Sequence, residues 1–177
     1  TPTVPSSDSS TTLAINNPNP NPLDITVSFT APTSDGGSAI TGYNLFSSDD
    51  NITFNSVASA VSVDQTITVS GPGTWYFKSQ SINNVGTAAS QGSAVSIATP
   101  TVPTASGVTL SIPSPNPSPL DIVASFTAPS SDGGSSVTGY NLLSSPDDST
   151  YNYVAQAVTT DQTITVANTG TWYFKSQ

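Results

Sequence analysis

Short runs in which apolar and polar residues alternate follow one another along the chain. The clearest covers residues 23–30, where Leu23, Ile25, Val27 and Phe29 alternate with polar residues. This period of two is typical of a β-strand that buries one face. Similar runs predict strands at residues 11–15, 39–47, 52–58, 65–69, 74–82 and 93–98. Turn residues separate these runs and no stretch has helical spacing, so the pattern is typical of an all-β sandwich or barrel.

The whole strand pattern occurs twice. Residues 22–80 align without a gap on residues 119–177, and 42 of the 59 positions are identical. The opening Thr-Pro-Thr-Val-Pro recurs at residues 99–103 and reads as a short, stiff linker. The repeat predicts two tandem domains, residues 1–98 and 99–177.

The second copy stops at Gln177, which matches Gln80 of the first copy. It is therefore expected to lack the end of its sixth strand and its seventh strand. Two explanations stay open: the sequence is part of a longer array, or another subunit donates the missing strand to an open sheet edge.

Each copy has an Asp-Gly-Gly turn after its second strand, at residues 35–37 and 132–134. The glycines can adopt positive φ, and the Asp carboxylate can accept backbone N–H groups ahead of it. The motif therefore needs only a structural explanation. Pro-rich stretches at residues 16–22 and 113–119 predict extended crossovers, because proline cannot donate to a sheet ladder.

The composition excludes several functions. The chain has no His, Cys, Glu or Arg, its only cations are Lys78 and Lys175, and its net charge is −9. A Ser-His or Cys-His catalytic unit is therefore absent, as are disulfides. Nucleic acid and anionic membranes are unfavourable partners for so acidic a chain. No run of apolar residues is long enough to insert in a membrane, and no cofactor is expected.

Several motifs agree in order and spacing with fibronectin type III domains, which this chain resembles. They are Phe29–Pro32, Asp35–Gly37, Ile40–Tyr43, Trp75–Phe77 and Asn83–Gly86. The resemblance implies seven-stranded Greek-key β-sandwiches in tandem, the second incomplete, that serve as spacers and binding modules.

The chain departs from the family at three places. Phe29 and Phe126 stand where the family usually has a core Trp, while Ser79 and Ser81 stand at usually apolar positions. Trp75 and Trp172 stand where the family has a Tyr whose hydroxyl forms a hydrogen bond. In that register, either an indole N–H replaces the phenol's bond or the bond is lost.

Two pairs of adjacent carboxylates are candidate calcium ligands. Asp49 with Asp50, and Asp147 with Asp148, each lie in the loop after the strand predicted at residues 39–47 or its equivalent in the second copy. Asp oxygens at close spacing suit Ca²⁺, but there is no Glu to bind in bidentate fashion. A solvated turn is the alternative interpretation.

Outward-facing aromatic and apolar residues are the candidate interaction face. If Leu45 points inward, Phe46 points outward, as does Tyr76 on the sixth strand. Leu143 and Tyr173 are their equivalents in the second copy. Such a face can contact a partner or stack on sugar rings, or it can form ordinary cross-strand pairs.

Together these features predict a non-catalytic structural or adhesive repeat module of an extracellular, cell-surface or virion-surface protein. Its expected partners are other copies or subunits of a surface assembly, with glycans as a second class. The alternative is an accessory, glycan-binding module of a secreted polysaccharide-degrading enzyme.

Overall fold

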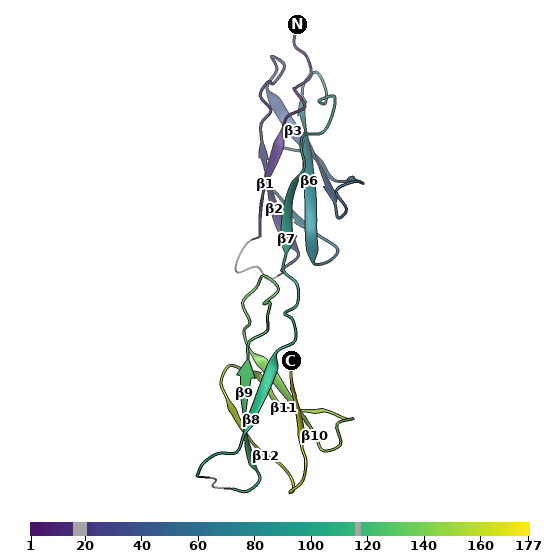
Figure 1. Cartoon of the computed structure of the whole chain (residues 1–177). Helices are drawn as coiled ribbons and strands as arrows, with labels where there is room; N and C mark the ends of the chain where they lie inside the picture. The colour runs from purple at the N-terminus through teal and green to yellow at the C-terminus, as the bar shows by residue number, and fades with distance from the viewer. Residues whose placement is uncertain (16–20, 116–117) are drawn as a thin grey trace. The chain divides into compact units, whose positions relative to one another are not determined.

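The computed structural model describes residues 1–15, 21–115 and 118–177, and every regular element in these ranges is a β-strand. The chain divides into two compact units, Thr1–Pro100 and Thr101–Gln177 (Figure 1). The sequence-based division places this boundary after Ala98. Parts of both Pro-rich crossovers, residues 16–20 and 116–117, lie outside the described residues.

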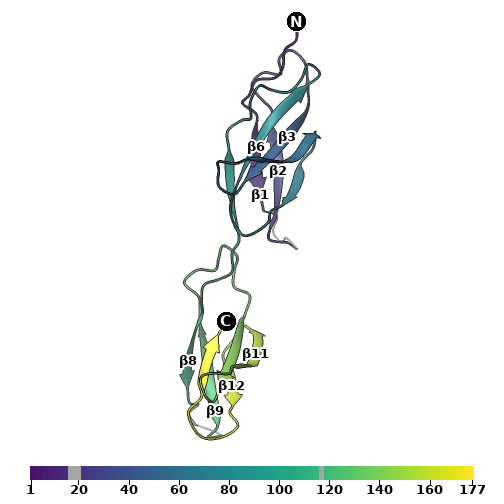
Figure 2. The same cartoon turned by 90° about the vertical axis from the view of Figure 1, so that its right-hand side faces the viewer.

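Unit 1 is a sandwich of two antiparallel sheets with seven strands. The smaller sheet has the order β1-β2-β5, and the larger has the order β4-β3-β6-β7. The strands are β1 (Ser10–Ala14), β2 (Asp24–Thr30), β3 (Ile40–Ser48), β4 (Asn55–Val61), β5 (Gln65–Thr68), β6 (Gly73–Asn83) and β7 (Val95–Thr99). Figure 2 shows β1 and β2 against β3 and β6.

The position of the fourth strand distinguishes this fold from that of constant-type immunoglobulin domains. In constant-type immunoglobulin domains the fourth strand lies in the sheet of the first two strands. Here β4 pairs with β3, so it belongs to the larger sheet. The fold is an all-β, fibronectin type III-like sandwich, as the sequence predicts.

Alternate residues from both sheets form the core of unit 1. Ile25 and Val27 of β2 and Leu45 and Phe77 of the larger sheet are completely buried. Phe29, at the position of the family's Trp, packs against this core. Its ring stacks on Tyr43 of the opposite sheet, with centroids 4.7 Å apart. Phe126 and Tyr140 repeat this contact in unit 2, so a stacked pair joins the sheets in each unit.

The two Trp residues keep a hydrogen bond at the place of the missing tyrosine. The Trp75 indole N–H donates to the Gly71 carbonyl at 3.0 Å, and that of Trp172 donates to the Asn168 carbonyl at 3.2 Å. The sequence left two outcomes open. In the structure, an indole N–H takes the place of the phenol's hydrogen bond.

Buried serines explain the other departure from the family. Ser79 and Ser81 are fully buried on the inner face of β6. The Ser79 hydroxyl donates to the Ser9 hydroxyl at 3.2 Å, and that of Ser81 donates to the Ser6 carbonyl at 3.3 Å. These serine hydroxyls form hydrogen bonds to the chain segment that precedes β1, which an apolar side chain could not do.

Strand positions agree with the sequence pattern except in one place. The strand predicted at residues 52–58 begins only at Asn55. The preceding residues form a turn around the Asp50 carboxylate, which accepts the N–H groups of Ile52 and Thr53. Turn chemistry therefore overrides the local apolar pattern.

Unit 2 repeats this arrangement with six strands in its described residues. They are β8 (Gly107–Ser111), β9 (Asp121–Thr127), β10 (Tyr140–Ser145), β11 (Asn152–Val158), β12 (Gln162–Thr165) and β13 (Tyr173–Ser176). The sheets are β8-β9-β12 and β11-β10-β13. β13, the counterpart of β6, is the last strand in the part of this copy that the structure describes.

The Asp-Gly-Gly turn holds the N-terminal segment of its own unit. Asp35 accepts the Gly37 N–H at 2.8 Å, and Gly36 and Gly37 have φ values of 71° and 75°. The Thr3 N–H donates to the Gly36 carbonyl at 2.8 Å, and Thr101 bonds Gly133 in the same way. The Thr-Pro-Thr-Val-Pro segment, predicted as a linker, is therefore bonded to the unit that it precedes.

We predict that Gly36→Ala destabilises unit 1 more than Gly37→Ala does. Both glycines have positive φ, which costs a residue with Cβ about 1 kcal/mol. A Cβ at Gly36 would also lie 2.2 Å from the Thr3 carbonyl oxygen, whereas a Cβ at Gly37 meets nothing within 4 Å. Chemical denaturation of the two variants measures this difference, and equal losses would contradict the contact.

Candidate functional site

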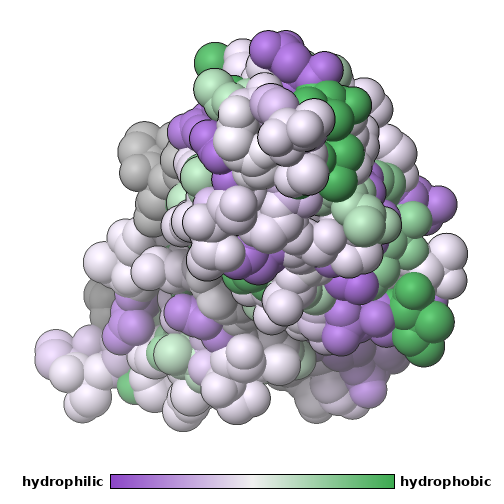
Figure 3. All heavy atoms as spheres, turned by 90° about the horizontal axis from the view of Figure 1, so that it is seen from above, coloured by the Kyte–Doolittle hydropathy of each residue, from purple (hydrophilic) through white to green (hydrophobic). Residues whose placement is uncertain are grey.

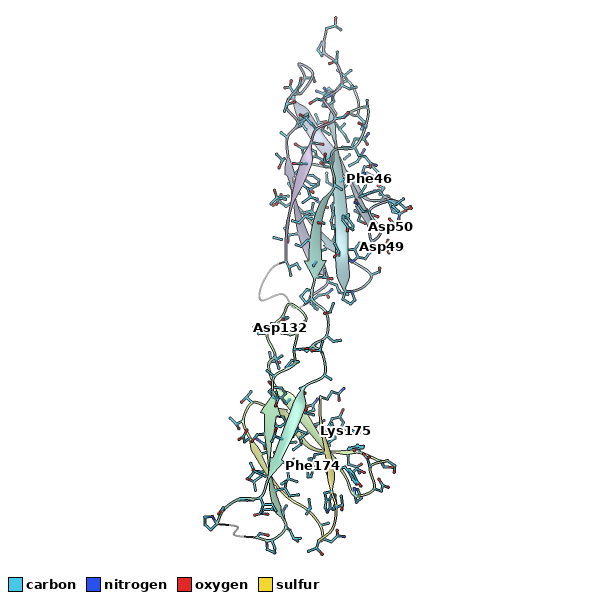
Figure 4. The ribbon with its side chains drawn as sticks, viewed as in Figure 1. Phe46, Asp49, Asp50, Asp132, Phe174 and Lys175 are labelled. Carbon is cyan, nitrogen blue, oxygen red and sulfur yellow. The ribbon has the colours of Figure 1, made fainter. Side chains whose placement is uncertain are left out.

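The candidate contact face of unit 1 is the outward side of its larger sheet, and that of unit 2 is the outward side of the equivalent sheet β11-β10-β13. In unit 1, β3 and β6 place Phe46 directly opposite Lys78, and Tyr76 lies diagonally, opposite Ser48. Phe46 and Tyr76 are both half-buried. Phe46 is labelled in Figure 4. The two residues share a face, but the charged side chain of Lys78 is the direct neighbour of Phe46.

Each unit's single lysine stacks on an aromatic ring on this face. The Lys78 ammonium lies 4.0 Å from the centroid of Phe54, and the Lys175 ammonium lies 3.8 Å from the centroid of Tyr151. Cation–π contacts of this kind fix both side chains over the sheet. Sequence reasoning missed Phe54 and Tyr151, although each lies the same number of residues before its lysine in the two copies.

The face of unit 2 is richer in exposed aromatic surface. Leu143 lies opposite both Tyr153 of β11 and Lys175 of β13, and Ser145 lies opposite Tyr173. Tyr153 is 53% exposed and Tyr173 is 39% exposed. Tyr153 was not among the residues predicted from the sequence, because the unit 1 residue at its position is Ser56.

The carboxylates of the loop after β3 stabilise a turn. Asp50 Oδ1 accepts the Ser48 hydroxyl at 2.7 Å and the N–H groups of Ile52 and Thr53 at 2.7 and 2.8 Å. Its unit 2 equivalent is Asp147, which accepts the corresponding donors of Ser145, Ser149 and Thr150. These bonds stabilise the ionised form and lower the pKa of Asp50 and of Asp147.

The two predicted carboxylate pairs are not equivalent to each other. Asp50 corresponds to Asp147, whereas Asp148 corresponds to Asn51. Asn51 and Asp148 both have positive φ, 59° and 57°. Asp148 accepts the Tyr151 hydroxyl, which raises the pKa of Tyr151 to about 12. Within the described ranges no three His, Cys, Asp or Glu residues cluster as metal ligands do, and calcium binding stays a prediction.

Comparison with known proteins gives a likeness of fold only. No model of a known protein family matches the chain, and no curated protein matches it. A crystal structure of domains A168–A170 from titin is similar over 55% of this chain, with 20% identity and a TM-score of 0.46. A structure of titin kinase and its flanking domains is similar over 71% of this chain, with 14% identity and a TM-score of 0.43. The matches cover only 33% and 28% of those chains.

One cavity of about 370 Å³ lies in unit 2. Its lining includes the apolar side chains Leu110, Leu120, Val166 and Trp172. The equivalent unit 1 residues belong to the core and its border, where Ile97 of β7 packs as well. Asp121, the cavity's single carboxylate, accepts the Thr165 hydroxyl at 2.6 Å. The residues that line the cavity are therefore those of a hydrophobic core.

The face of the molecule seen in Figure 3 is mostly of intermediate hydropathy. In Figure 3, apolar residues form small groups that are separated by polar ones. In the part of the chain that the structure describes, no helix is long and apolar enough to cross a membrane.

We predict that unit 1 loses stability in acid because its hydrogen-bonded carboxylates become protonated. The hydrogen bonds of Ser6 and Thr33 lower the pKa of Asp8 to about 2, from an ordinary value of 3.8. Because the folded-state pKa is the lower one, this stabilisation is present above about pH 4 and is lost as the pH falls to about 2. Asp50 acts in the same direction.

Denaturation of Asp8→Asn and Asp50→Asn at pH 6 and pH 2 measures this contribution. Both variants should lose less stability on acidification than the parent chain. Asp49→Asn is the control, since it removes the same charge from the loop but leaves the bonds to Asp50 intact. Parallel pH curves for all four proteins would contradict the prediction.

Proposed function

We propose that the chain is a non-catalytic repeat module of a structural protein at the outside of a cell or virion. It spaces β-sandwich units and repeats a contact face on each of them. Its partners are other copies or subunits of a surface assembly, with glycans as a second class. The observation that carries this proposal is the short connection between the units.

Only one residue separates Thr99, which is hydrogen-bonded within unit 1, from Thr101, which is hydrogen-bonded within unit 2. Thr99 is buried, and its hydroxyl contacts both the N–H and the carbonyl of Gly73. The Thr101 N–H donates to the Gly133 carbonyl at 2.8 Å. Pro100 lies between them, and its ring fixes φ near −65°. So short and stiff a connection suits a spacer better than a flexible tether.

The repeated face supports multivalent contact. Both units place a lysine on an aromatic ring at the equivalent site of the larger sheet. Similar sites repeated along one chain raise the effective concentration of each further contact, so weak contacts suffice for adhesion. Catalysis is disfavoured because the chain has no His, Cys, Glu or Arg. A surface rich in Ser and Thr and low in charge suits the extracellular environment.

The spacer role predicts a narrow distribution of distances between the units. The chain has no native cysteine, so one cysteine at Ser59 and one at Thr160, both exposed, can carry spin labels. Pulsed electron–electron double resonance should give a narrow distribution of distances between the two labels. Insertion of Gly-Gly-Ser-Gly after Pro100 should broaden it clearly. Equally broad distributions with and without the insertion would overturn the spacer proposal.

A further inference from the structure

The outer face of unit 2 carries one more aromatic side chain than that of unit 1, because Tyr153 stands where unit 1 has Ser56. We call Tyr151, Tyr153, Tyr173 and Lys175 the tyrosine face. The Tyr153 hydroxyl donates to Gln177 Oε1 at 3.3 Å, across β10 from its own strand. The phenol ring therefore lies across the sheet, while the residue remains 53% exposed. A ring held in this way exposes an aromatic surface at little cost in side-chain entropy.

The comparison between the units shows that the fold does not require the ring of Tyr153. The two copies share the strand pairing around β3 and β10, including the irregular register after Leu45 and Leu142. Ser56 of unit 1 takes the position of Tyr153, and Phe54 takes that of Tyr151. Since unit 1 forms the same strand pairing with a serine at this position, the exposed tyrosine is available for a partner.

Charge restricts the class of partner. A chain of net charge −9 repels anionic ligands, and its lysine on this face is already stacked on Tyr151. An apolar protein segment would suit exposed Leu, Ile or Val, but the most exposed rings here carry phenol hydroxyls. Around them lie the Gln177 amide, the Lys175 ammonium and the Asp148 carboxylate, which are donors and acceptors for hydroxyl groups.

We propose that the tyrosine face binds neutral, extended polysaccharides by stacking on the C–H faces of their sugar rings. Neighbouring strands are about 4.8 Å apart, so β11 and β13, on either side of β10, lie about 10 Å apart. Tyr173 also lies two residues, about 7 Å, further along the strands than Tyr153, so the two residues are about 12 Å apart. An extended sugar chain that crosses the strands diagonally can therefore contact both rings. The inference deepens the proposed function, because it names the partner class of one contact face.

Titration of the 177-residue chain with cellohexaose and chitohexaose, followed by NMR, tests the proposal. Resonances of β10, β11 and β13 should shift, and Tyr153→Ser should weaken binding about tenfold, the loss expected for one stacked ring. The substitution installs the residue of unit 1, so the fold should survive. Val63→Ser removes an exposed apolar side chain of unit 1 and should change nothing.

The reciprocal variant makes the test stricter. Ser56→Tyr should create a second, weaker site on unit 1, with shifts on β3, β4 and β6. No shift for either sugar with the parent chain would overturn the proposal, as would unchanged binding by Tyr153→Ser. Tighter binding of polyuronate than of the neutral sugars would also overturn it. Self-association that Tyr153→Ser abolishes would assign the face to a second copy instead.

These outcomes are independent of the spacer measurement. A narrow distance distribution without sugar binding would refute only the tyrosine-face proposal. A broad distribution with sugar binding would refute the spacer role and leave a glycan-binding module, as in the alternative of an accessory module of a secreted polysaccharide-degrading enzyme.

Discussion

Burial of one face of each sheet is the constraint on which the rest of the structure depends. Alternation sends Leu45 and Phe77 of unit 1 inward, where both are fully buried, and it sends their neighbours outward. The core is small, and the Phe29–Tyr43 stack joins its two sheets. Because the inner faces hold the sandwich together, the outer face of the larger sheet can vary between copies, as Ser56 and Tyr153 do.

The sequence was sufficient to predict the strands, the repeat and the sandwich class, because each rests on local rules. Period-two alternation placed β2, and the glycines of the Asp-Gly-Gly turn have the positive φ expected of them. The start of β4 was predicted wrongly, since three hydrogen bonds to the Asp50 carboxylate form a turn there. Such a competition between turn and strand depends on three-dimensional contacts that alternation does not encode.

The candidate site was less predictable for a similar reason. Parity along the strands predicted Phe46 and Tyr76 on one face. Register decides which side chains meet, and it puts Lys78 opposite Phe46. The lysine–ring stacks join residues far apart in the sequence, so one strand's pattern cannot reveal them. Likewise, equal spacing of acidic residues suggested equivalent pairs, whereas alignment of the copies gives Asp50 and Asp147 the turn role and separates Asp148 from it.

The central claim is that inner faces stabilise each unit while the outer face is left for contact. Chemical denaturation of matched unit 2 variants tests it most directly. Leu142→Ala, at a fully buried position, should lower the free energy of unfolding by about 2–5 kcal/mol. Tyr153→Ser, on the exposed face, should change it by no more than about 0.5 kcal/mol. Equal losses of unfolding free energy from the two substitutions would show that the outer face also stabilises the fold. That result would contradict the account.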